Sequence, residues 1–192
     1  MTTREKWNRR YSQNSVDTAP LASRVLGENL HLLPETGHAL DLACGRGGNA
    51  ISLAEHGLHV EAWDISDVAI EGLQTRVDQA AIDIHAHVRD VETSPPEQNR
   101  FDVIVISYFL ERNIIPSLIA ALRPGGLMFY QTFTRQRVTA RGPAQDEFRL
   151  AGQELLQLFH GLKVLYYREE GTAGDIQQGC RDEAQYIGMK PA

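Results

Sequence analysis

The stretch LDLACGRGGNA, residues 40–50, decides how the rest of the chain is interpreted. An apolar segment that contains one acid, Asp41, runs into a glycine-rich turn and then into a helix-forming segment. Gly45-x-Gly47-x-x-Ala50 fits the G-x-G-x-x-G/A pattern of nucleotide-binding turns, in which glycines let the backbone come close to a ligand. A carboxylate beside this turn would repel a pyrophosphate, so Asp41 favours a ligand with a cationic head.

Strand-like and helix-like segments alternate along the rest of the chain. The expected strands are residues 38–43, 58–63, 82–88, 101–107, 127–133, 162–168 and 184–189. The expected helices are residues 48–56, 67–80 with Ser66 as N-cap, 114–122 and 152–159, and Pro124-Gly125-Gly126 stops the helix 114–122 before the fifth strand, where the family resemblance described below implies a turn. This order predicts an α/β fold, a doubly wound and mostly parallel seven-stranded sheet with helices on both faces and the last strands antiparallel at one edge.

Composition limits the classes of function. The 192 residues suit a single domain, and the net charge of 19 − 25 = −6 argues against a nucleic-acid partner. Cys44 and Cys180 lie far apart and form no disulfide framework, which predicts a reducing, cytoplasmic setting. The longest apolar run, residues 103–110, is much shorter than the ~20 residues that a bilayer requires, so no membrane partner is expected. A small-molecule substrate and a monomer or homodimer are expected instead.

A second acid lies at the end of the second expected strand. Asp64 in VEAWD follows Asp41 by 64 − 41 = 23 residues, and an acid about 20 residues after such a turn is placed to bind ribose hydroxyls. This spacing fits a nicotinamide cofactor as well as other nucleosides. Ile65, which follows, either packs on an adenine ring or belongs to the core.

Five segments together resemble the class I S-adenosylmethionine-dependent methyltransferases. They are DLACGRGGNA (41–50), VEAWD (60–64), RDV (89–91), FDVIVISYFL (101–110) and LRPGGLMFYQTF (122–133), in the order and spacing of that family. The resemblance runs from about Trp7 to the C-terminus. It implies a Rossmann-like methyltransferase fold, S-adenosylmethionine as methyl donor and S-adenosylhomocysteine as product.

The resemblance also implies a cofactor site. The first turn would line the methionine end, Asp64 would hold the ribose, Asp90 would face the adenine amino group with Val91 beside the ring, and Ser107 would border the cofactor. The residues expected to bind the cofactor are Trp7, Arg10, Tyr11, Asp41, Ala43, Gly45, Gly47, Asn49, Asp64, Ile65, Asp90, Val91 and Ser107.

The beginning of the chain is similar to a smaller group within this family. Trp7-Asn8-x-Arg10-Tyr11 resembles the N-terminal helix of the small-molecule methyltransferases around the tellurite-resistance and thiopurine enzymes. That resemblance implies that residues 1–30 form a helical lid over the cofactor. The tellurite-resistance enzymes tend to carry a His-Arg pair before their final strands, where this chain reads GTAGD (171–175), so tellurite as a substrate is not implied.

The resulting hypothesis is methyl transfer by in-line displacement to a small thiol, oxyanion or similar soft or anionic acceptor. Tyr11, Tyr108 and Arg112 are the candidate catalytic residues, although no obvious base stands out. Arg135, Arg137 and Arg141 follow the fifth strand and, with Arg112, could receive an anion at the rim.

Two other functions remain open at this point. An NAD-dependent oxidoreductase would share the turn, although it normally needs a second substrate domain. A non-catalytic cofactor-binding module would share the whole cofactor site. No metal site is expected, because His85-x-His87 lacks further ligands at suitable spacing.

Overall fold

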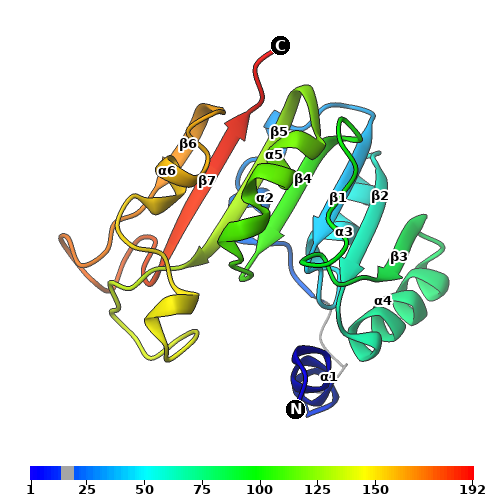
Figure 1. Ribbon diagram of the computed structural model, residues 1–192, viewed down its shortest axis with the longest axis horizontal. Coiled ribbons are helices and arrows are strands. Elements are labelled where there is room, and N and C mark those ends of the chain that lie inside the picture. Colours follow the sequence, from blue (N-terminus) through cyan, green and yellow to red (C-terminus); the bar gives the residue numbers. More distant parts are fainter. Residues whose placement is uncertain (14–19) are drawn as a thin grey trace.

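The seven expected strands form one sheet in the computed structural model, which describes residues 1–13 and 20–192 (Figure 1). The strands are β1 His38–Leu42, β2 His59–Asp64, β3 Ile84–Val88, β4 Phe101–Ser107, β5 Leu122–Phe133, β6 Lys163–Arg168 and β7 Glu183–Met189. Their order in the sheet is β3-β2-β1-β4-β5-β7-β6. The pairs from β3 to β5 are parallel, and β7 is antiparallel to both β5 and β6. This arrangement confirms the predicted fold class.

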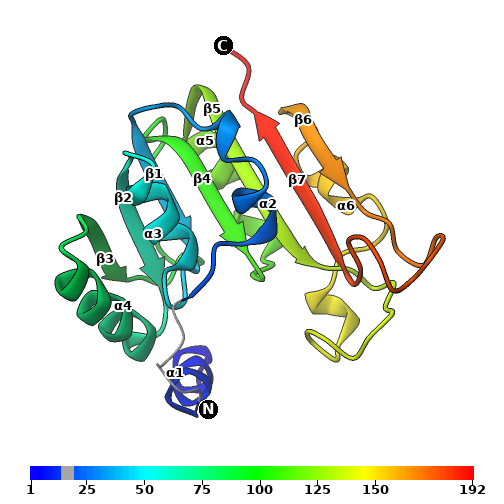
Figure 2. The ribbon, with the colours of Figure 1, turned by 180° about the vertical axis from the view of Figure 1, so that it is seen from behind.

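Helices cover both faces of the sheet (Figures 1 and 2). One face carries α2 Arg24–Gly27, α3 Gly48–Glu55 and α4 Asp67–Ala80, and the other carries α5 Ile115–Ala121 and α6 Glu154–Leu158. Three short 3-10 turns, η1 Leu30–Leu32, η2 Arg112–Ile114 and η3 Asp146–Phe148, were not expected. The first helix, α1 Thr3–Gln13, lies beyond the carboxyl ends of β1 and β2 (Figure 1). None of the described helices is long and apolar enough to cross a membrane.

The central position of β4 in the sheet explains why the sequence of this strand is continuously apolar. Val103, Ile104, Val105 and Ile106 are all completely buried. Ile104 and Ile106 pack into the cluster under α5 and α6, whereas Val103 and Val105 pack into the cluster under α2, α3 and α4. Because alternate side chains enter different cores, both sets must be apolar.

The Pro124-Gly125-Gly126 segment differs from the expectation. It lies inside β5, which begins at Leu122, and not in a turn before the strand. The Gly125 amide donates to the Lys190 carbonyl at 2.9 Å, and the β4 register shifts between Phe101 and Val103. A bulge of this kind lets proline stay within a strand that otherwise pairs on both sides.

Two other boundaries also moved. The edge strand β3 begins at Ile84 and not at residue 82, and α6 covers only Glu154–Leu158 of the expected helix 152–159. Gln153 has a φ of +61°, a left-handed conformation that interrupts helical geometry immediately before α6. The other expected helices lie within one residue of expectation, with α3 ending at Glu55 and α5 covering Ile115–Ala121, and Ser66 caps α4 by accepting the Ala69 amide at 3.2 Å.

Candidate active site

A cavity of about 1580 Å³ opens at the carboxyl ends of the parallel strands. It lies where the strand order reverses between β1 and β4, the place where doubly wound sheets bind ligands. Of the residues expected to bind the cofactor, all but Asp41 and Gly47 line this cavity, namely Trp7, Arg10, Tyr11, Ala43, Gly45, Asn49, Asp64, Ile65, Asp90, Val91 and Ser107. Pockets for one small ligand usually measure about 300–1,000 Å³, so this cavity is larger than one such ligand requires.

Asp64 connects the first turn to the second. Its carboxylate accepts the Gly45 amide at 2.9 Å and the Ser66 amide at 2.8 Å, one bond to each oxygen. The side chain is only 5% exposed, and burial raises its pKa despite these bonds. Each carboxylate oxygen has a second lone pair, so Asp64 retains capacity to accept hydroxyl groups from a ligand in the cavity.

Asp41 lies behind the cavity wall and not in it, which corrects the expectation that it lines the methionine end. Its fully buried carboxylate accepts the Ala50 amide at 3.0 Å and the Asn49 side chain at 3.3 Å. Both donors belong to the first turn of α3. Desolvation raises the pKa of Asp41 to about 7. In this structure the acid holds the glycine turn on the helix that follows it.

The raised pKa of Asp41 predicts a pH-dependent effect of Asp41→Asn. Between the ordinary value near 3.8 and about 7, the native state binds a proton that the unfolded state does not, so wild-type stability falls as pH rises through this window. We expect the free energy of unfolding of Asp41→Asn, relative to wild type, to improve by up to about 1.4 kcal/mol per pH unit from pH 5 to 7. Urea unfolding at four pH values measures it, with the exposed Asp78→Asn as control. A difference that stays constant with pH would contradict the assignment.

The glycines of the turn face different neighbours. Gly45 has a φ of +54°, and a Cβ there would lie 2.7 Å from the Tyr11 hydroxyl oxygen, so this glycine lets α1 close over the cavity. Gly47 has a φ of +80°, and its Cβ would lie 2.3 Å from a methyl carbon of Leu73 in α4. Gly47 therefore allows two helices to pack, which corrects the expectation that it borders the cofactor.

Asn49 joins three segments at the cavity wall. Its amide nitrogen donates to Asp41 and to the Ser107 hydroxyl at 3.1 Å, and its oxygen accepts the Ser23 amide at 2.8 Å. The hydroxyl of Ser23 also lies in the cavity wall, is buried and has no hydrogen-bond partner within the described residues. A buried hydroxyl without a partner is costly, so its presence here favours a polar ligand group.

The connection that follows β3 forms another part of the cavity wall, next to Asp64. Asp90 accepts the Glu92 amide at 3.0 Å through one oxygen, and the buried Val91 lies beside it. The Arg89 guanidinium stacks on the Trp63 ring at 3.8 Å and donates to the Ser94 carbonyl at 2.8 Å, which fixes the segment. The arrangement offers an apolar surface with a carboxylate at its edge, as an adenine ring requires.

The helix α1 covers this end of the cavity. The rings of Trp7 and Tyr11 lie 5.9 Å apart on one helix face, and the Ser66 hydroxyl donates to Asn8 at 2.6 Å. The guanidinium of Arg46 in the glycine turn donates to the Tyr11 carbonyl at 2.8 Å. Burial and the nearby Asp64 charge raise the pKa of Tyr11, so its hydroxyl stays protonated at neutral pH and does not serve as a base.

A second polar group lies at the opposite end of the cavity and was missed from the sequence. Gln131 of β5 and Glu183 of β7 are buried in the wall, next to Tyr108 and Arg141. The signal available was weak, a glutamine in an apolar strand and an acid one residue before the last expected strand. Only the antiparallel pairing of β5 with β7 brings the two together.

Arg112, Arg135 and Arg137 do not line the cavity, which corrects the hypothesis of a basic rim. Arg112 donates to both Glu154 oxygens, at 2.5 and 3.2 Å, and to the carbonyls of Glu147 and Arg149. Arg135 donates to the Asp146 carbonyl at 3.2 Å, and Arg137 pairs with the Asp146 carboxylate. These side chains hold the connection after β5, and Arg112 has no position from which to act as a catalytic residue.

We therefore expect Arg112→Ala to affect stability and not ligand binding. Removing the guanidinium leaves the largely buried Glu154 without its ion-pair partner and two carbonyls without a donor. The Arg112 side chain is 34% exposed, so solvent screens part of this loss, and the expected cost is about 1–3 kcal/mol in urea unfolding. The dissociation constant of S-adenosylhomocysteine should remain that of wild type. If ligand binding falls while stability is unchanged, Arg112 has a role at the site.

Metal binding receives no support. Among residues 1–13 and 20–192, no group of three or more His, Cys, Asp or Glu side chains is placed to hold an ion. His85 and His87 lie exposed on the edge strand β3.

Comparisons with known proteins agree with this geometry. Residues 39–126 match the model of a methyltransferase domain family. The ubiquinone biosynthesis O-methyltransferase of Coxiella burnetii is 31% identical over 103 residues, which cover 51% of this chain and 44% of that protein. The putative methyltransferase YqeM of Bacillus subtilis is 26% identical over 160 residues, which cover 72% and 64%. The chain thus spans about half of the first relative and about two thirds of the second.

A solved structure has the same fold over nearly the whole chain. TehB from Haemophilus influenzae superimposes with a TM-score of 0.73 at 21% identity, covering 96% of this chain and 67% of TehB. The domain match includes the glycine turn, Asp64 and the carboxyl end of β4, which together form one end of the cavity. The similarity to methyltransferase sequences therefore covers residues 39–126, and the similarity to TehB shows a shared fold.

Proposed function

We propose that this protein transfers the methyl group of S-adenosylmethionine to a small-molecule acceptor by in-line displacement. The observation that carries the proposal is one cavity with two chemically different ends. Asp64, Asp90 and the glycine turn form a nucleoside-sized end, and Tyr108, Gln131 and Glu183 form a separate polar end. A cofactor alone would not require the second end.

The residues of the first end fit S-adenosylmethionine. Asp64 has lone pairs left for ribose hydroxyls, Val91 and Ile65 offer an apolar surface for the adenine ring, and Asp90 has one oxygen left for the amino group. The buried Ser23 hydroxyl, which has no hydrogen-bond partner among the described residues, favours a polar group of the ligand near the glycine turn. When bound, S-adenosylmethionine supplies a methyl group on a positively charged sulfur that is already an activated leaving group.

The role of the chain itself is then mainly positioning. Holding an acceptor in line with the methyl and excluding water can supply ~7–11 kcal/mol of the barrier. The buried wall that Gln131 and Glu183 form is suited to that role because both side chains are fixed by hydrogen bonds. An acceptor that ionises easily, such as a thiol or an acidic hydroxyl, requires only a weak base. The similarity to an O-methyltransferase favours oxygen as one such acceptor.

We propose further that α1 is a lid in the N-terminal region 1–30, of which residues 14–19 lie outside the described part. None of its side chains is fully buried, and its contacts include the glycine turn, α4 and, through Lys6, the Phe148 ring. Lids of this kind keep water from the reaction. Hydrogen exchange should therefore show stronger protection of residues 3–13 when S-adenosylhomocysteine is added. Equal protection in both states would mean that α1 is a fixed part of the domain.

Binding and turnover test the proposal against its alternatives. Isothermal titration with S-adenosylmethionine and with NAD separates the methyltransferase from the oxidoreductase. Turnover of labelled S-adenosylmethionine with a panel of thiols, oxyanions and small phenols separates the enzyme from a non-catalytic cofactor-binding module. Binding of NAD alone, or cofactor binding without any transfer, would reject the proposal. A cytoplasmic location and a monomeric or homodimeric state stay predictions.

A further inference from the structure

Glu183 carries a carboxylate at the end of the cavity away from Asp64. It is 6% exposed, and it accepts the Gln131 amide at 2.7 Å and the Arg141 guanidinium at 3.0 Å. One bond to each oxygen leaves a lone pair on each. Asp182, the acid beside it, has less capacity left, because it accepts three bonds, from the Val138 amide and from the amide and hydroxyl of Thr139.

The orientation of Gln131 follows from its partners. Its oxygen accepts the backbone amide of Val25 at 2.8 Å, and a backbone amide can only donate. The nitrogen of Gln131 must therefore be the group that faces Tyr108, at 2.9 Å, and Glu183. Because the Tyr108 oxygen accepts this bond, its own proton is the one that it donates, and the Glu183 carboxylate beside it is one acceptor for that proton.

Tyr108 stays protonated at neutral pH. Burial and the negative charge of Glu183 raise its pKa to about 12. A φ of +57° and a contact between its ring and Phe133, with centroids 5.0 Å apart, hold the side chain at the cavity wall. This end of the cavity thus combines a hydroxyl donor, Tyr108, with a carboxylate acceptor, Glu183.

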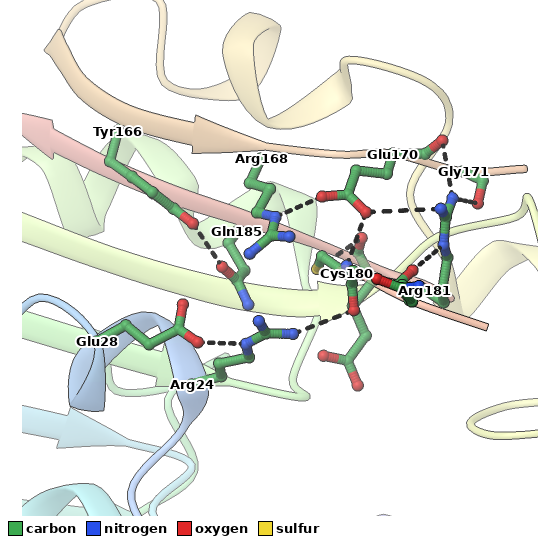
Figure 3. A network of polar contacts seen from close by, with 12 residues as sticks. Arg24, Glu28, Tyr166, Arg168, Glu170, Gly171, Cys180, Arg181 and Gln185 are labelled. Atoms are coloured by element: carbon green, nitrogen blue, oxygen red, sulfur yellow. Dashed lines mark hydrogen bonds and ion pairs between the residues drawn. The ribbon is translucent and has the colours of Figure 1, made fainter. Parts of the chain in front are cut away.

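The charges nearby disfavour an anionic ligand. Arg141 is already paired with Glu183. Arg181 also lines the cavity, but its guanidinium donates to the carbonyls of Gly171, Asp175 and Gln178 at 2.6–2.9 Å (Figure 3). An anion at this end would face the Glu183 carboxylate without an uncommitted cation among these residues. A neutral group with a proton to donate fits better.

Three large apolar side chains of the cavity wall are exposed to solvent. Tyr108, Phe148 and Ile176 line the cavity with 42–48% of their surface exposed. Large apolar side chains around a cavity with a few polar groups are typical of sites for mostly apolar small molecules. The body of the ligand should therefore be apolar.

The segment that leads into Glu183 is held in place before any ligand arrives. Glu170 accepts the Arg168 guanidinium at 2.6 Å and the Cys180 amide at 2.8 Å, and Arg24 of α2 donates to the Gly179 carbonyl at 3.2 Å (Figure 3). These bonds fasten residues 170–180 to β6 and α2. A carboxylate fixed in this way is pre-organised for a role toward a ligand.

We propose that the acceptor is a small, largely apolar molecule with one nucleophilic hydroxyl or thiol, and that Glu183 removes the proton of that group. The inference rests on the proposed methyl transfer. The acceptor oxygen or sulfur gains a bond to the methyl carbon, and the bond from that carbon to the donor sulfur breaks with its electrons going to that sulfur. The acceptor proton passes to the Glu183 carboxylate and then to water. Tyr108 donates a hydrogen bond that orients the acceptor.

The first test asks in which protonation state an acceptor binds. 4-Nitrophenol is titrated into protein saturated with S-adenosylhomocysteine, and its absorbance spectrum separates bound phenol from bound phenolate. In wild type the bound ratio of phenol to phenolate should exceed the ratio in solution about tenfold, because a carboxylate favours the neutral form. Glu183→Gln should lose this excess, and Glu147→Gln, an exposed acid outside the cavity wall, should keep it. Preferred binding of phenolate by wild type, or no binding to the loaded protein, would overturn the inference.

The second test uses transfer itself. With a phenol or thiol acceptor from the panel, Glu183→Gln should lower kcat about 10²–10⁴-fold with little change in KM. Glu183→Asp, which keeps a carboxylate, should restore part of the rate. Unchanged affinity for S-adenosylhomocysteine shows that each variant is folded. An unchanged kcat in Glu183→Gln would overturn the role of Glu183.

The two proposals can fail separately. Methyl transfer to selenite or another anion, with none to phenols or thiols, would leave the methyltransferase in place and reject the acceptor class. A Glu183-dependent spectrum of bound 4-nitrophenol, without methyl transfer to any acceptor, would keep the binding site and reject the proposed function.

Discussion

Asp64→Asn is expected to weaken binding of S-adenosylhomocysteine by about 10–150-fold, equivalent to ~1.5–3 kcal/mol for one hydrogen bond to a charged group. The wild-type carboxylate accepts the Gly45 and Ser66 amides and still has a lone pair on each oxygen. An asparagine keeps only one oxygen, and its NH₂ group would face one of these two backbone donors. The variant therefore loses both acceptor capacity toward the ligand and part of the link between the two turns.

Isothermal titration with S-adenosylhomocysteine measures this effect at a temperature where the variant is folded. Asp78→Asn is the matched control, since Asp78 is an exposed acid of α4 that hydrogen-bonds to Gln74. The same titration with adenosine should show a similar loss if the ribose is the group that Asp64 binds. A dissociation constant equal to that of wild type would reduce Asp64 to a structural link between Gly45 and Ser66.

The sequence predicted this end of the cavity well because local rules control it. Each parallel strand delivers its last residues to the same edge of the sheet, so the residues after β1, β2 and β4 had to meet there. Asp64 was expected from its place at the end of the second strand, and Asn49 and Ser107 were expected from the family resemblance; all three line the cavity.

The other end depends on contacts between residues far apart in the chain. Gln131 and Glu183 are 52 residues apart and meet only through the antiparallel pairing of β5 with β7. Likewise, Arg112 follows β4 as an exposed basic rim would require, yet its partner Glu154 is 42 residues away. Without that pairing, the sequence does not show whether an arginine binds a ligand or an acid of its own chain.

The sequence likewise does not show whether Gly47 is needed for the backbone geometry of the glycine turn or for close packing against Leu73. A stability measurement separates these two roles. Gly47→Ala should cost about 2–5 kcal/mol, the sum of ~1–2 for a left-handed residue with a Cβ and ~1–3 for overpacking. The added Cβ would lie 2.3, 2.9 and 3.1 Å from three carbons of Leu73, which is completely buried between α3 and α4. Its neighbours leave Leu73 little freedom to move aside.

Gly125→Ala provides a close control for the backbone contribution. Gly125 has a φ of +79°, against +80° for Gly47, but a Cβ there would meet no atom within 4 Å. The difference between the two alanine variants in urea unfolding therefore isolates the contact with Leu73. In a Leu73→Ala background the cost of Gly47→Ala should fall to that of Gly125→Ala, a coupling of about 1–3 kcal/mol. Equal costs for Gly47→Ala and Gly125→Ala in the wild-type background would mean that Gly47 serves only the backbone geometry of the turn and not the packing of α3 against α4.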